Sequence, residues 1–574
     1  MKRFTRILSL VFAVTVFVLY ARCLCFAHIG LDDAAYTFRN PFVAGGFSLG
    51  NVVEAFTNLR HGGIWMPVTY MTYMLDASLC RWTGLPPIGE MHVVNVLLHA
   101  VNFLLLVKLI SMLFFSRGNG RDSHLSPSSA HAQAVIAVIA AMVWAIHPLR
   151  AEPVAWIAAR KELLWTLFAL SGLMCWIKAL EFSTLANSPT RQLNISTILF
   201  CALACLSKPT AMCFPLLALL VAWWCGAFAW RCGDAAHPCS NARRWSFIVQ
   251  LFVFFLIAAV TGAIAAYSQT HVAGREAVAL YAAPFAHRLV NALSAIGYYL
   301  RTTFWPSGLH VDCRAVPGIW PLDAAWNFAV LSIGAVFSAF LICGRRSTFI
   351  FSTAWFLVSL LPTLGLFGSF GIEAHADRFA YLPSMAFSFL AVSLLVPRAN
   401  GWRPAVAVLI LLAGATFLQL SYWRNDATAH QRALACDPEH PRAMVHVADA
   451  RCSRQHDFDG GIRLYRQALM YADRVPTGGF DVEDVKAKLA YALATRGRHD
   501  DFSEVKRLGA AILLDMRLDR RGLMLDALGT AFLHDGDMQR AAQLFKASID
   551  APDRFWPKAS TLRKLESCQR PTTS

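Results

Sequence analysis

Two adjacent carboxylates, Asp32 and Asp33, follow the first long apolar run of the chain. Neighbouring acids repel each other, which raises the pKa of one of them and suits that group to accept a proton from a hydroxyl. A solvated turn or a helix N-cap is the alternative for such a pair. We therefore take Asp32 and Asp33 as the candidate catalytic bases, with the turn as the competing interpretation.

Basic residues recur in three other polar segments between apolar runs, at residues 147–162, 207–209 and 375–383. Arginine and lysine near a membrane surface suit the phosphate or pyrophosphate of a lipid carrier, because they combine positive charge with several hydrogen-bond donors. Anchoring to lipid headgroups is equally compatible with them, as are local ion pairs such as Arg150–Glu152 and Asp377–Arg378. The candidate phosphate-binding residues are Arg150, Lys161, Lys208 and Arg378.

A polar stripe crosses one apolar segment, where His92, Asn95, His99 and Asn102 recur at helical spacing. Polar residues on a helix in lipid must face the interior of the bundle, either for hydrogen bonding or to line a substrate groove. A metal site is a poor fit, because the two histidines are separated by two helical turns and no carboxylate joins them. The further substrate-groove candidates are Tyr36, Asn40, Trp65, His147, Glu152 and Asp377.

The elements that must position these residues are membrane helices. The chain of 574 residues is 56% hydrophobic and 15% charged, with a mean hydropathy of +0.45. A soluble protein of that composition would expose large apolar patches, so the excess apolar surface must face lipid. The net charge of +16 is scattered over short loops rather than gathered in a patch, which argues against nucleic-acid binding.

A helix needs about 20 apolar residues to cross a bilayer, and about eleven segments qualify as candidates. They predict an all-α, polytopic helix bundle over residues 1–423. Residues 284–305 are apolar but interrupted by polar groups, so we predict an amphipathic helix on the outer interface. The predicted spans are residues 7–27, 92–115, 132–147, 162–181, 194–206, 209–229, 246–268, 325–343, 348–370, 379–396 and 403–421.

The distribution of arginine indicates the orientation of these spans. With a cytoplasmic N-terminus, the inner loops contain Arg117, Arg121, Arg231, Arg345 and Arg398, whereas the outer loops hold most of the acids. This asymmetry is the positive-inside pattern. An odd number of spans then predicts that the C-terminus lies outside the cytoplasm.

Residues 424–574 are polar with helical periodicity, which predicts a separate extracytoplasmic domain. Gly529 and Phe532, followed by Ala541 and Phe545, place small and aromatic residues at the offsets of a tetratricopeptide repeat. Small residues let paired helices approach, and the aromatic residues fill the space between repeats. We predict a superhelix of such repeats, with a generic helical bundle as the alternative. Copies of the pattern lie at residues 448–468, 488–508 and 528–545.

The order of the motifs resembles one known family. The chain contains, in sequence, Asp-Asp-x-x-Tyr-x-x-x-Asn-Pro, Trp-x-Pro-x-Thr, His-x-x-Asn-x-x-x-His-Ala, His-Pro-Leu-Arg-x-Glu-x-Val-Ala-Trp, Ser-Lys-Pro and Ala-Asp-Arg-Phe-x-Tyr-Leu-Pro. Together these motifs resemble the transmembrane-and-tetratricopeptide-repeat O-mannosyltransferase family and its bacterial relatives, over essentially the whole chain. Met66 stands where many members have arginine, and the repeat array is short. Both departures leave the acceptor and the sugar open.

The resemblance implies a membrane glycosyltransferase of the C fold that uses a sugar carried on polyprenyl phosphate. Mannose would move to an extracytoplasmic acceptor, a protein hydroxyl, with Asp32 or Asp33 as general base and the four candidate cations on the phosphate. The repeats would bind the acceptor protein, a glycan or an assembly partner. A multi-pass protein of a bacterial inner membrane is implied, with the N-terminus cytoplasmic and the repeats periplasmic.

Two other functions remain compatible with the sequence. A non-catalytic membrane scaffold would recruit partners through its repeats, and a lipid-linked glycan ligase would use similar membrane chemistry. No residue cluster requires a metal cofactor, and dependence on a divalent metal stays open.

Overall fold

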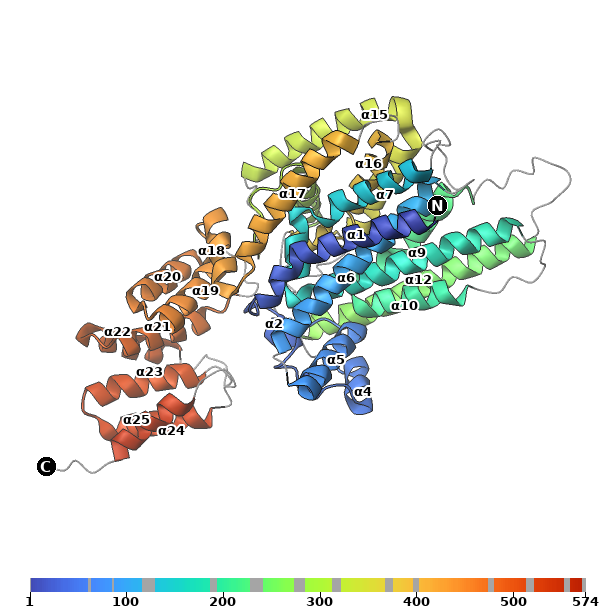
Figure 1. Cartoon of the computed structure of the whole chain (residues 1–574). Helices are drawn as coiled ribbons and strands as arrows, with labels where there is room; N and C mark the ends of the chain where they lie inside the picture. Colours follow the sequence, from blue (N-terminus) through green and yellow to red (C-terminus); the bar gives the residue numbers. More distant parts are fainter. Residues whose placement is uncertain are drawn as a thin grey trace. The chain divides into compact units, whose positions relative to one another are not determined.

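The computed structural model contains only helices in the part of the chain that it describes, which confirms the predicted all-α class (Figure 1). The chain divides into two compact units, one that reaches to Ala429 and one that begins at His430. The structure describes residues 2–59, 63–84, 87–115, 130–185, 194–227, 241–272, 284–311, 322–366, 375–395, 402–472, 480–512, 521–551 and 558–569.

The first unit is a membrane domain. Among the described residues, five helical stretches are long and apolar enough to cross a bilayer, and a bent pair, His131–Ala145 with Pro148–Ala155, is a sixth candidate. The five stretches are Arg6–Cys25, Gly89–Phe115, Ile157–Leu180, Trp245–Gln269 and Pro404–Tyr422.

The principal helices of this unit run in chain order from the N-terminus to the last span (Figure 1). They are α1 (Lys2–Tyr20), α2 (Asp33–Tyr36), α3 (Pro41–Ala44), α4 (Leu49–Thr57), α5 (Pro67–Thr83), α6 (Pro87–Ile110), α7 (Ala130–Ala145), α8 (Ala151–Ala155), α9 (Arg160–Leu185), α10 (Ile195–Ser207), α11 (Phe214–Trp224), α12 (Asn241–Val272), α14 (Phe285–Phe304), α15 (Leu322–Leu360), α16 (Met385–Leu395) and α17 (Trp402–Tyr422).

Exposed apolar side chains mark the outer faces of the spanning helices. Val14 and Val18 of α1 are 61% and 66% exposed, and Ile410 and Leu411 of α17 are 67% and 73% exposed. Rows of large apolar side chains in water would be costly, so these faces are the surfaces that lipid covers.

One pair of predicted spans differs from the structure. Residues 325–343 and 348–370 were expected as two spans with a loop between them, but residues 322–360 form one helix, α15. The hydropathy drops at Arg345 and Arg346, yet arginine is a good helix former, so the backbone stays helical there. A charged pair interrupts an apolar pattern without ending a helix.

The predicted orientation and number of spans stay predictions. Arg117, Arg121, Arg231 and Arg398, which the inner loops were expected to contain, lie outside the described residues. The same holds for the last residues of the predicted spans 209–229, 348–370 and 379–396. The expected amphipathic helix at residues 284–305 is present as α14, with Ala292, Ala295 and Tyr299 buried, and its place at the membrane interface stays a prediction.

The second unit consists of helix pairs that match the three predicted repeats, and the predicted tetratricopeptide-type array is confirmed. Each of α19, α21 and α23 packs on the helix that follows it. The helices are α18 (Asp426–Cys436), which contains the division between the units, α19 (Pro441–Ala450), α20 (Phe458–Tyr471), α21 (Val482–Arg496), α22 (His499–Ile512), α23 (Arg521–His534), α24 (Met538–Asp550) and α25 (Lys558–Gln569).

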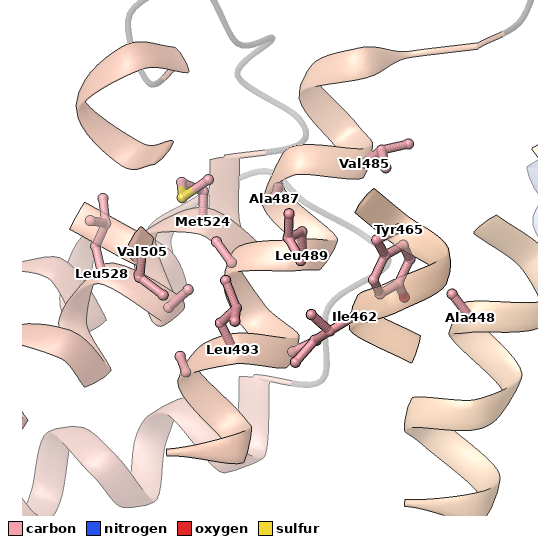
Figure 2. Packing of buried hydrophobic residues seen from close by; sticks show 14 of the residues in the cluster. Ala448, Ile462, Tyr465, Val485, Ala487, Leu489, Leu493, Val505, Met524 and Leu528 are labelled. Atoms are coloured by element: carbon pink, nitrogen blue, oxygen red, sulfur yellow. The ribbon is translucent and has the colours of Figure 1, made fainter. Parts of the chain in front are cut away.

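Small residues let these paired helices approach closely. A Cβ atom added at Gly529 would lie 2.6 Å from the ring of Phe545, so only glycine leaves room for that ring. The core between the pairs is built from alanine, leucine and valine with Tyr465 and Met524, and Figure 2 shows Leu489, Leu493 and Ile462 within it. The pattern of small and large residues in the sequence is therefore the packing pattern of the repeats.

Candidate active site

The site is built on a break in the helical path at residues 145–160. α7 ends at Ala145, and the next apolar helix, Pro148–Ala155, departs from it by 64°. Pro148 has no N–H group and disfavours helical backbone before it, so α7 cannot continue. The ring of His147 accepts a hydrogen bond from the Leu149 N–H at 3.2 Å and donates to the Thr303 carbonyl at 2.9 Å, which caps the turn.

The polar stripe of α6 holds this broken segment. The amide of Asn95 donates to the Trp156 carbonyl at 3.1 Å, and that of Asn102 donates to the Leu163 carbonyl at 3.0 Å. The His99 ring donates to the Ala145 carbonyl at 2.9 Å and accepts from the Tyr381 hydroxyl at 2.7 Å. These three residues satisfy backbone groups in the interior, which is the hydrogen-bonding alternative of the sequence analysis.

The fourth member of the stripe, His92, is also buried, with its ring edge-on to Phe26 at 6.3 Å between centroids. The stripe thus packs against the first loop and the broken segment rather than lining an open groove.

A buried ion pair that the sequence analysis missed fixes the start of α9. One guanidinium nitrogen of Arg160 lies 2.5 Å from a carboxylate oxygen of Asp76, and the others donate to the Asn95 side chain and the Met91 carbonyl, each at 2.9 Å. Arg160 is completely buried. The available signal was Asp76 itself, because an acid among the apolar residues of α5 needs a buried partner.

Asp33 joins the first loop to the broken segment. Its two carboxylate oxygens accept hydrogen bonds from the backbone N–H groups of Ile29 at 2.7 Å and Ala158 at 2.8 Å. Burial raises the pKa of Asp33 to about 7, although both of these hydrogen bonds act in the opposite direction. With both oxygens engaged and the side chain enclosed, Asp33 serves first as a structural link.

The rest of the first loop is held by further hydrogen bonds. The Ala27 N–H donates to the Arg424 carbonyl at 2.9 Å, and the Gly30 N–H donates to the Asp426 carboxylate at 2.7 Å. Asn40 caps α3 by accepting from the N–H groups of Phe42 and Val43, which is a structural position for this candidate. Trp65 likewise donates its indole N–H to the Phe56 carbonyl at 3.1 Å.

Asp32 differs from its neighbour because its side chain is 42% exposed. The Lys161 ammonium lies 3.9 Å from one oxygen of Asp32 and 3.5 Å from the Tyr36 hydroxyl. The same ammonium is 4.5 Å from the centre of the Tyr36 ring, a cation–π distance. Asp32, Tyr36 and Lys161 therefore form one group, in which Asp32 is open to solvent while Tyr36 and Lys161 are buried.

Two shared aromatic rings bring Lys161 together with Arg378 and Lys208. Arg378 and Lys161 lie 4.9 and 5.9 Å from the centre of the Trp156 ring, while Arg378 and Lys208 lie 4.8 and 4.9 Å from that of Phe379. We call Lys161, Lys208 and Arg378 the cation cluster. All three are largely buried, so their charge acts in surroundings that screen it poorly.

Two glutamates balance part of this charge. Arg378 donates to Glu152 through its guanidinium at 2.5 Å and through its backbone N–H at 2.9 Å. Lys208 pairs with Glu162, which also accepts from the indole of Trp165. Lys161 has its nearest carboxylate, Asp32, at the longer distance of 3.9 Å. The charge of Lys161 is thus the least compensated of the three.

Arg150 is placed outside the cation cluster. It is completely buried and donates to the carbonyls of Ala380 at 3.2 Å and Tyr381 at 2.8 Å, so it holds the turn that follows Arg378. In place of the Arg150–Glu152 pair suggested by the sequence, Glu152 pairs with Arg378. The other suggested pair, Asp377–Arg378, stays a prediction.

Asp377 is buried and accepts a hydrogen bond from the Tyr298 hydroxyl at 2.5 Å. Burial raises the pKa of Asp377 to about 8, with the nearby Glu152 as a further cause. Like Asn40 and His99, this candidate supports the fold around the site.

A cavity of about 320 Å³ lies beside the first loop and is bordered by Asp33. It offers partly open, mostly apolar space beside Asp33. Its lining residues are His28, Asp33, Thr37, Phe38, Val43, Ala44, Ala77, Cys80, Arg81, Met91 and Ile157.

The fold and the site define a helical membrane protein with an open carboxylate beside clustered cations and a repeat array in the same chain. Three curated proteins that match this chain are all named protein O-mannosyl-transferases. The chain is 22% identical over 441 residues to the protein O-mannosyl-transferase F38B6.6 of Caenorhabditis elegans, covering 72% of this chain and 55% of that protein. It is 34% identical over 120 residues to the protein O-mannosyl-transferase TMTC4 of Homo sapiens, covering 20% of this chain and 15% of that protein.

These homologues confirm the resemblance to the transmembrane-and-tetratricopeptide-repeat O-mannosyltransferases. The chain spans about half of the length of the nematode relative and a smaller part of the human one. No family model matches the chain. A crystal structure of yeast Tom70 aligns with 88% of this chain and 91% of its own at 11% identity, but the TM-score of 0.21 is too low to inform the fold.

Proposed function

We propose that this chain is a membrane glycosyltransferase that moves mannose from a polyprenyl-phosphate carrier to a hydroxyl group of an extracytoplasmic protein. The names of the homologues support the sugar and the protein acceptor. The observation that carries the proposal is the position of Asp32, an exposed carboxylate 3.9 Å from Lys161 at the edge of three buried cations. A scaffold would have no use for that arrangement.

Asp32 acts as the general base in the proposed reaction. The acceptor oxygen attacks the first carbon of the mannose and forms the new glycosidic bond, while the bond from that carbon to the phosphate oxygen breaks. The hydroxyl proton passes to Asp32, and the electron pair of the broken bond leaves with polyprenyl phosphate. Asp32 suits this role because it is the member of the acidic pair that an acceptor can reach.

The cation cluster stabilises the departing phosphate. Negative charge grows on the phosphate oxygen as the glycosidic bond breaks, and preorganised cations in a poorly screened site lower the free energy of that transition state. Lys161 is the nearest to Asp32, so it faces both the base and the leaving group. Arg378 and Lys208 reinforce the charge, each held in place by a glutamate.

Trp156 and Phe379 give this cluster its geometry. Each ring lies within cation–π distance of two cations, so its attraction offsets part of the repulsion between like charges. The backbone beneath Trp156 is held by Asn95, and the turn after Phe379 by Arg150. The repeat array would bind the acceptor protein outside the cytoplasm.

A donor comparison tests the proposal. Full-length protein in lipid nanodiscs is incubated with secreted proteins of the source cells and with tritiated mannose on polyprenyl phosphate or on GDP. Label should enter protein only from the lipid donor, and the Asp32→Asn variant should lose this transfer. Transfer of label from GDP-mannose would contradict the proposal. So would the absence of transfer from both donors, if no polyprenyl phosphate is released from the lipid donor either.

A further inference from the structure

The indole N–H group of Trp156 differs from those of six other buried tryptophans in the membrane unit. Each of the six donates its indole N–H to a carbonyl or carboxylate oxygen at 2.8–3.1 Å, and they are Trp65, Trp144, Trp165, Trp176, Trp224 and Trp355. Trp156 is 1% exposed, and among the described residues its indole N–H has no acceptor. A buried donor without an acceptor is costly, so this group calls for a partner that binds from outside.

The position of Trp156 is fixed by its neighbours. Its backbone N–H donates to the Glu152 carbonyl at 3.0 Å, and its carbonyl accepts from the Asn95 amide at 3.1 Å. The indole packs on the ring of Trp423, with 6.3 Å between the ring centres. The indole is therefore preorganised, and a ligand that uses its N–H group would find that group already in place.

The surroundings of this indole are rich in positive charge. Arg378 and Lys161 lie 4.9 and 5.9 Å from the centre of the Trp156 ring. The two glutamates of the cation cluster, Glu152 and Glu162, are already bonded to cations. An unbonded N–H donor beside clustered cations fits a ligand that is anionic and presents hydrogen-bond acceptors.

We propose that the indole of Trp156 donates its N–H to an oxygen of the lipid phosphate that the cation cluster holds. An ionised phosphate has three acceptor oxygens, and its hydrogen bonds are stronger than those between neutral groups. Indole is a donor without acceptor capacity, so it fits an oxygen of this kind. The phosphate is that of the polyprenyl carrier, and this assignment rests on the proposed function.

This role of Trp156 predicts opposite effects on binding and on stability. In the protein without donor, the unbonded N–H lowers the stability of the fold, because it lost its hydrogen bond to water on burial. When the phosphate binds, the N–H gains a charged acceptor. Removal of the N–H alone should therefore weaken phosphate binding without destabilising the protein, which a purely structural tryptophan would not do.

The test uses full-length protein in nanodiscs of phosphatidylcholine. Naphthylalanine in place of Trp156 keeps two fused rings but has no N–H, and Trp156→Phe is the second variant. Trp224→Phe is the matched control, because its buried indole donates to the Leu113 carbonyl at 2.8 Å. The rise in unfolding temperature with added polyprenyl phosphate gives an apparent Kd for each protein. Polyprenol of the same length and phosphatidic acid are the comparison lipids.

Both variants at position 156 should bind polyprenyl phosphate about tenfold to a hundredfold more weakly than the wild type, since each loses a hydrogen bond to a charged oxygen. Trp224→Phe should keep the Kd of the wild type. Without added lipid, the naphthylalanine variant should unfold no lower than the wild type, whereas Trp224→Phe should unfold at a lower temperature. Polyprenol and phosphatidic acid should not distinguish the variants at position 156 from the wild type.

An unchanged Kd in the naphthylalanine variant would overturn the proposal, because the ring rather than its N–H would then matter. An equal loss of affinity for phosphatidic acid would overturn it as well, in favour of a phospholipid as the ligand. A wild type that polyprenyl phosphate does not stabilise at all would contradict the proposed function itself. The failure of this assignment is thus distinct from the failure of the enzyme proposal.

Discussion

The same chemical pair, arginine with aspartate, occurs in both units of this protein in different surroundings. Arg160 and Asp76 of the membrane unit lie 2.5 Å apart with side chains 0% and 7% exposed. Arg498 and Asp459 of the repeat unit lie 2.8 Å apart with side chains 61% and 46% exposed. Distance alone would rank these pairs as equals, but water competes for the second pair and not for the first.

This contrast extends to what holds each unit together. In the membrane unit, buried polar groups hold backbone segments in place around the site, as Asn95 and Arg150 do. In the repeat unit, small and large apolar side chains interlock, and some ion pairs, such as Arg498–Asp459, are exposed to water. Removal of a buried charge should therefore lower stability most in the membrane unit. A change in the size of a packed side chain should lower stability most in the repeat unit.

The largest expected effect is the loss of the buried pair. Asp76→Ala leaves the charge of Arg160 buried without its carboxylate, which should lower the free energy of unfolding by about 3–5 kcal/mol. Unfolding in detergent, followed by tryptophan fluorescence, measures this change. The double variant Asp76→Leu with Arg160→Met is the control and should recover most of the stability. If the free energy of unfolding falls by less than about 1 kcal/mol, this buried pair contributes no more than an exposed ion pair does.

The second prediction separates the two members of the acidic pair. Asp32→Asn should lower sugar transfer by about a hundredfold, because a carboxylate base commonly contributes about 10²–10⁴-fold. Its unfolding temperature should stay unchanged, since the side chain is 42% exposed. Asp33→Asn removes one of two acceptors and should cost about 1–3 kcal/mol of stability. Equal loss of transfer without loss of stability in both variants would contradict this division.

The pH dependence of stability gives a further readout for Asp33 in the same comparison. Burial raises its pKa to about 7, whereas an unfolded aspartate titrates near about 3.9. Between these values the folded protein keeps a proton that the unfolded chain has released, so stability should fall as the pH rises through this window. Asp33→Asn should flatten this slope, and Asp32→Asn should keep it.

The third prediction concerns the donor. Arg378→Ala removes a charged hydrogen-bond donor and should weaken donor binding by about 1.5–3 kcal/mol, seen as a higher KM for the polyprenyl-phosphate sugar. Arg378→Lys should recover only part of this loss, since lysine lacks the planar fork that also holds Glu152. An unchanged KM in Arg378→Ala would show that Arg378 does not bind the donor and serves only as the ion-pair partner of Glu152.

The fourth prediction applies to the repeat unit, where fit matters more than charge. Gly529→Ala brings a methyl group within 2.6 Å of the Phe545 ring. Overpacking of this kind should cost about 1–3 kcal/mol. Hydrogen exchange of the full chain should show faster exchange in α23 and α24 while the membrane helices keep their protection. Unchanged exchange would show that these two helices separate easily.

The smallest effect is expected for the exposed pair. Arg498→Ala should leave hydrogen exchange in α21 and α22 unchanged, because Arg498 and Asp459 both face water. In addition, Asp459 keeps its ion pair with Arg496 at 2.5 Å. Faster exchange there would show that an exposed network of charges carries part of the stability of the repeats.

Local pattern was enough to predict several features of this protein. Apolar length indicated the membrane helices, and the helical spacing of glycine and aromatic residues indicated the repeats, because both depend on side chains near each other in sequence. The acidic pair and the three residues of the cation cluster were also visible as residue types placed beside apolar runs.

Only the tertiary structure decided the surroundings and the partners of each of these residues. Asp32 and Asp33 are adjacent, yet one is open and the other is enclosed, because Asp33 meets the Ala158 N–H from a distant segment. Glu152 could have paired with its neighbour Arg150 but pairs with Arg378, 226 residues away. Helical periodicity is a local property of the chain, whereas the partner of a buried charge is set by long-range packing, which the sequence pattern does not encode.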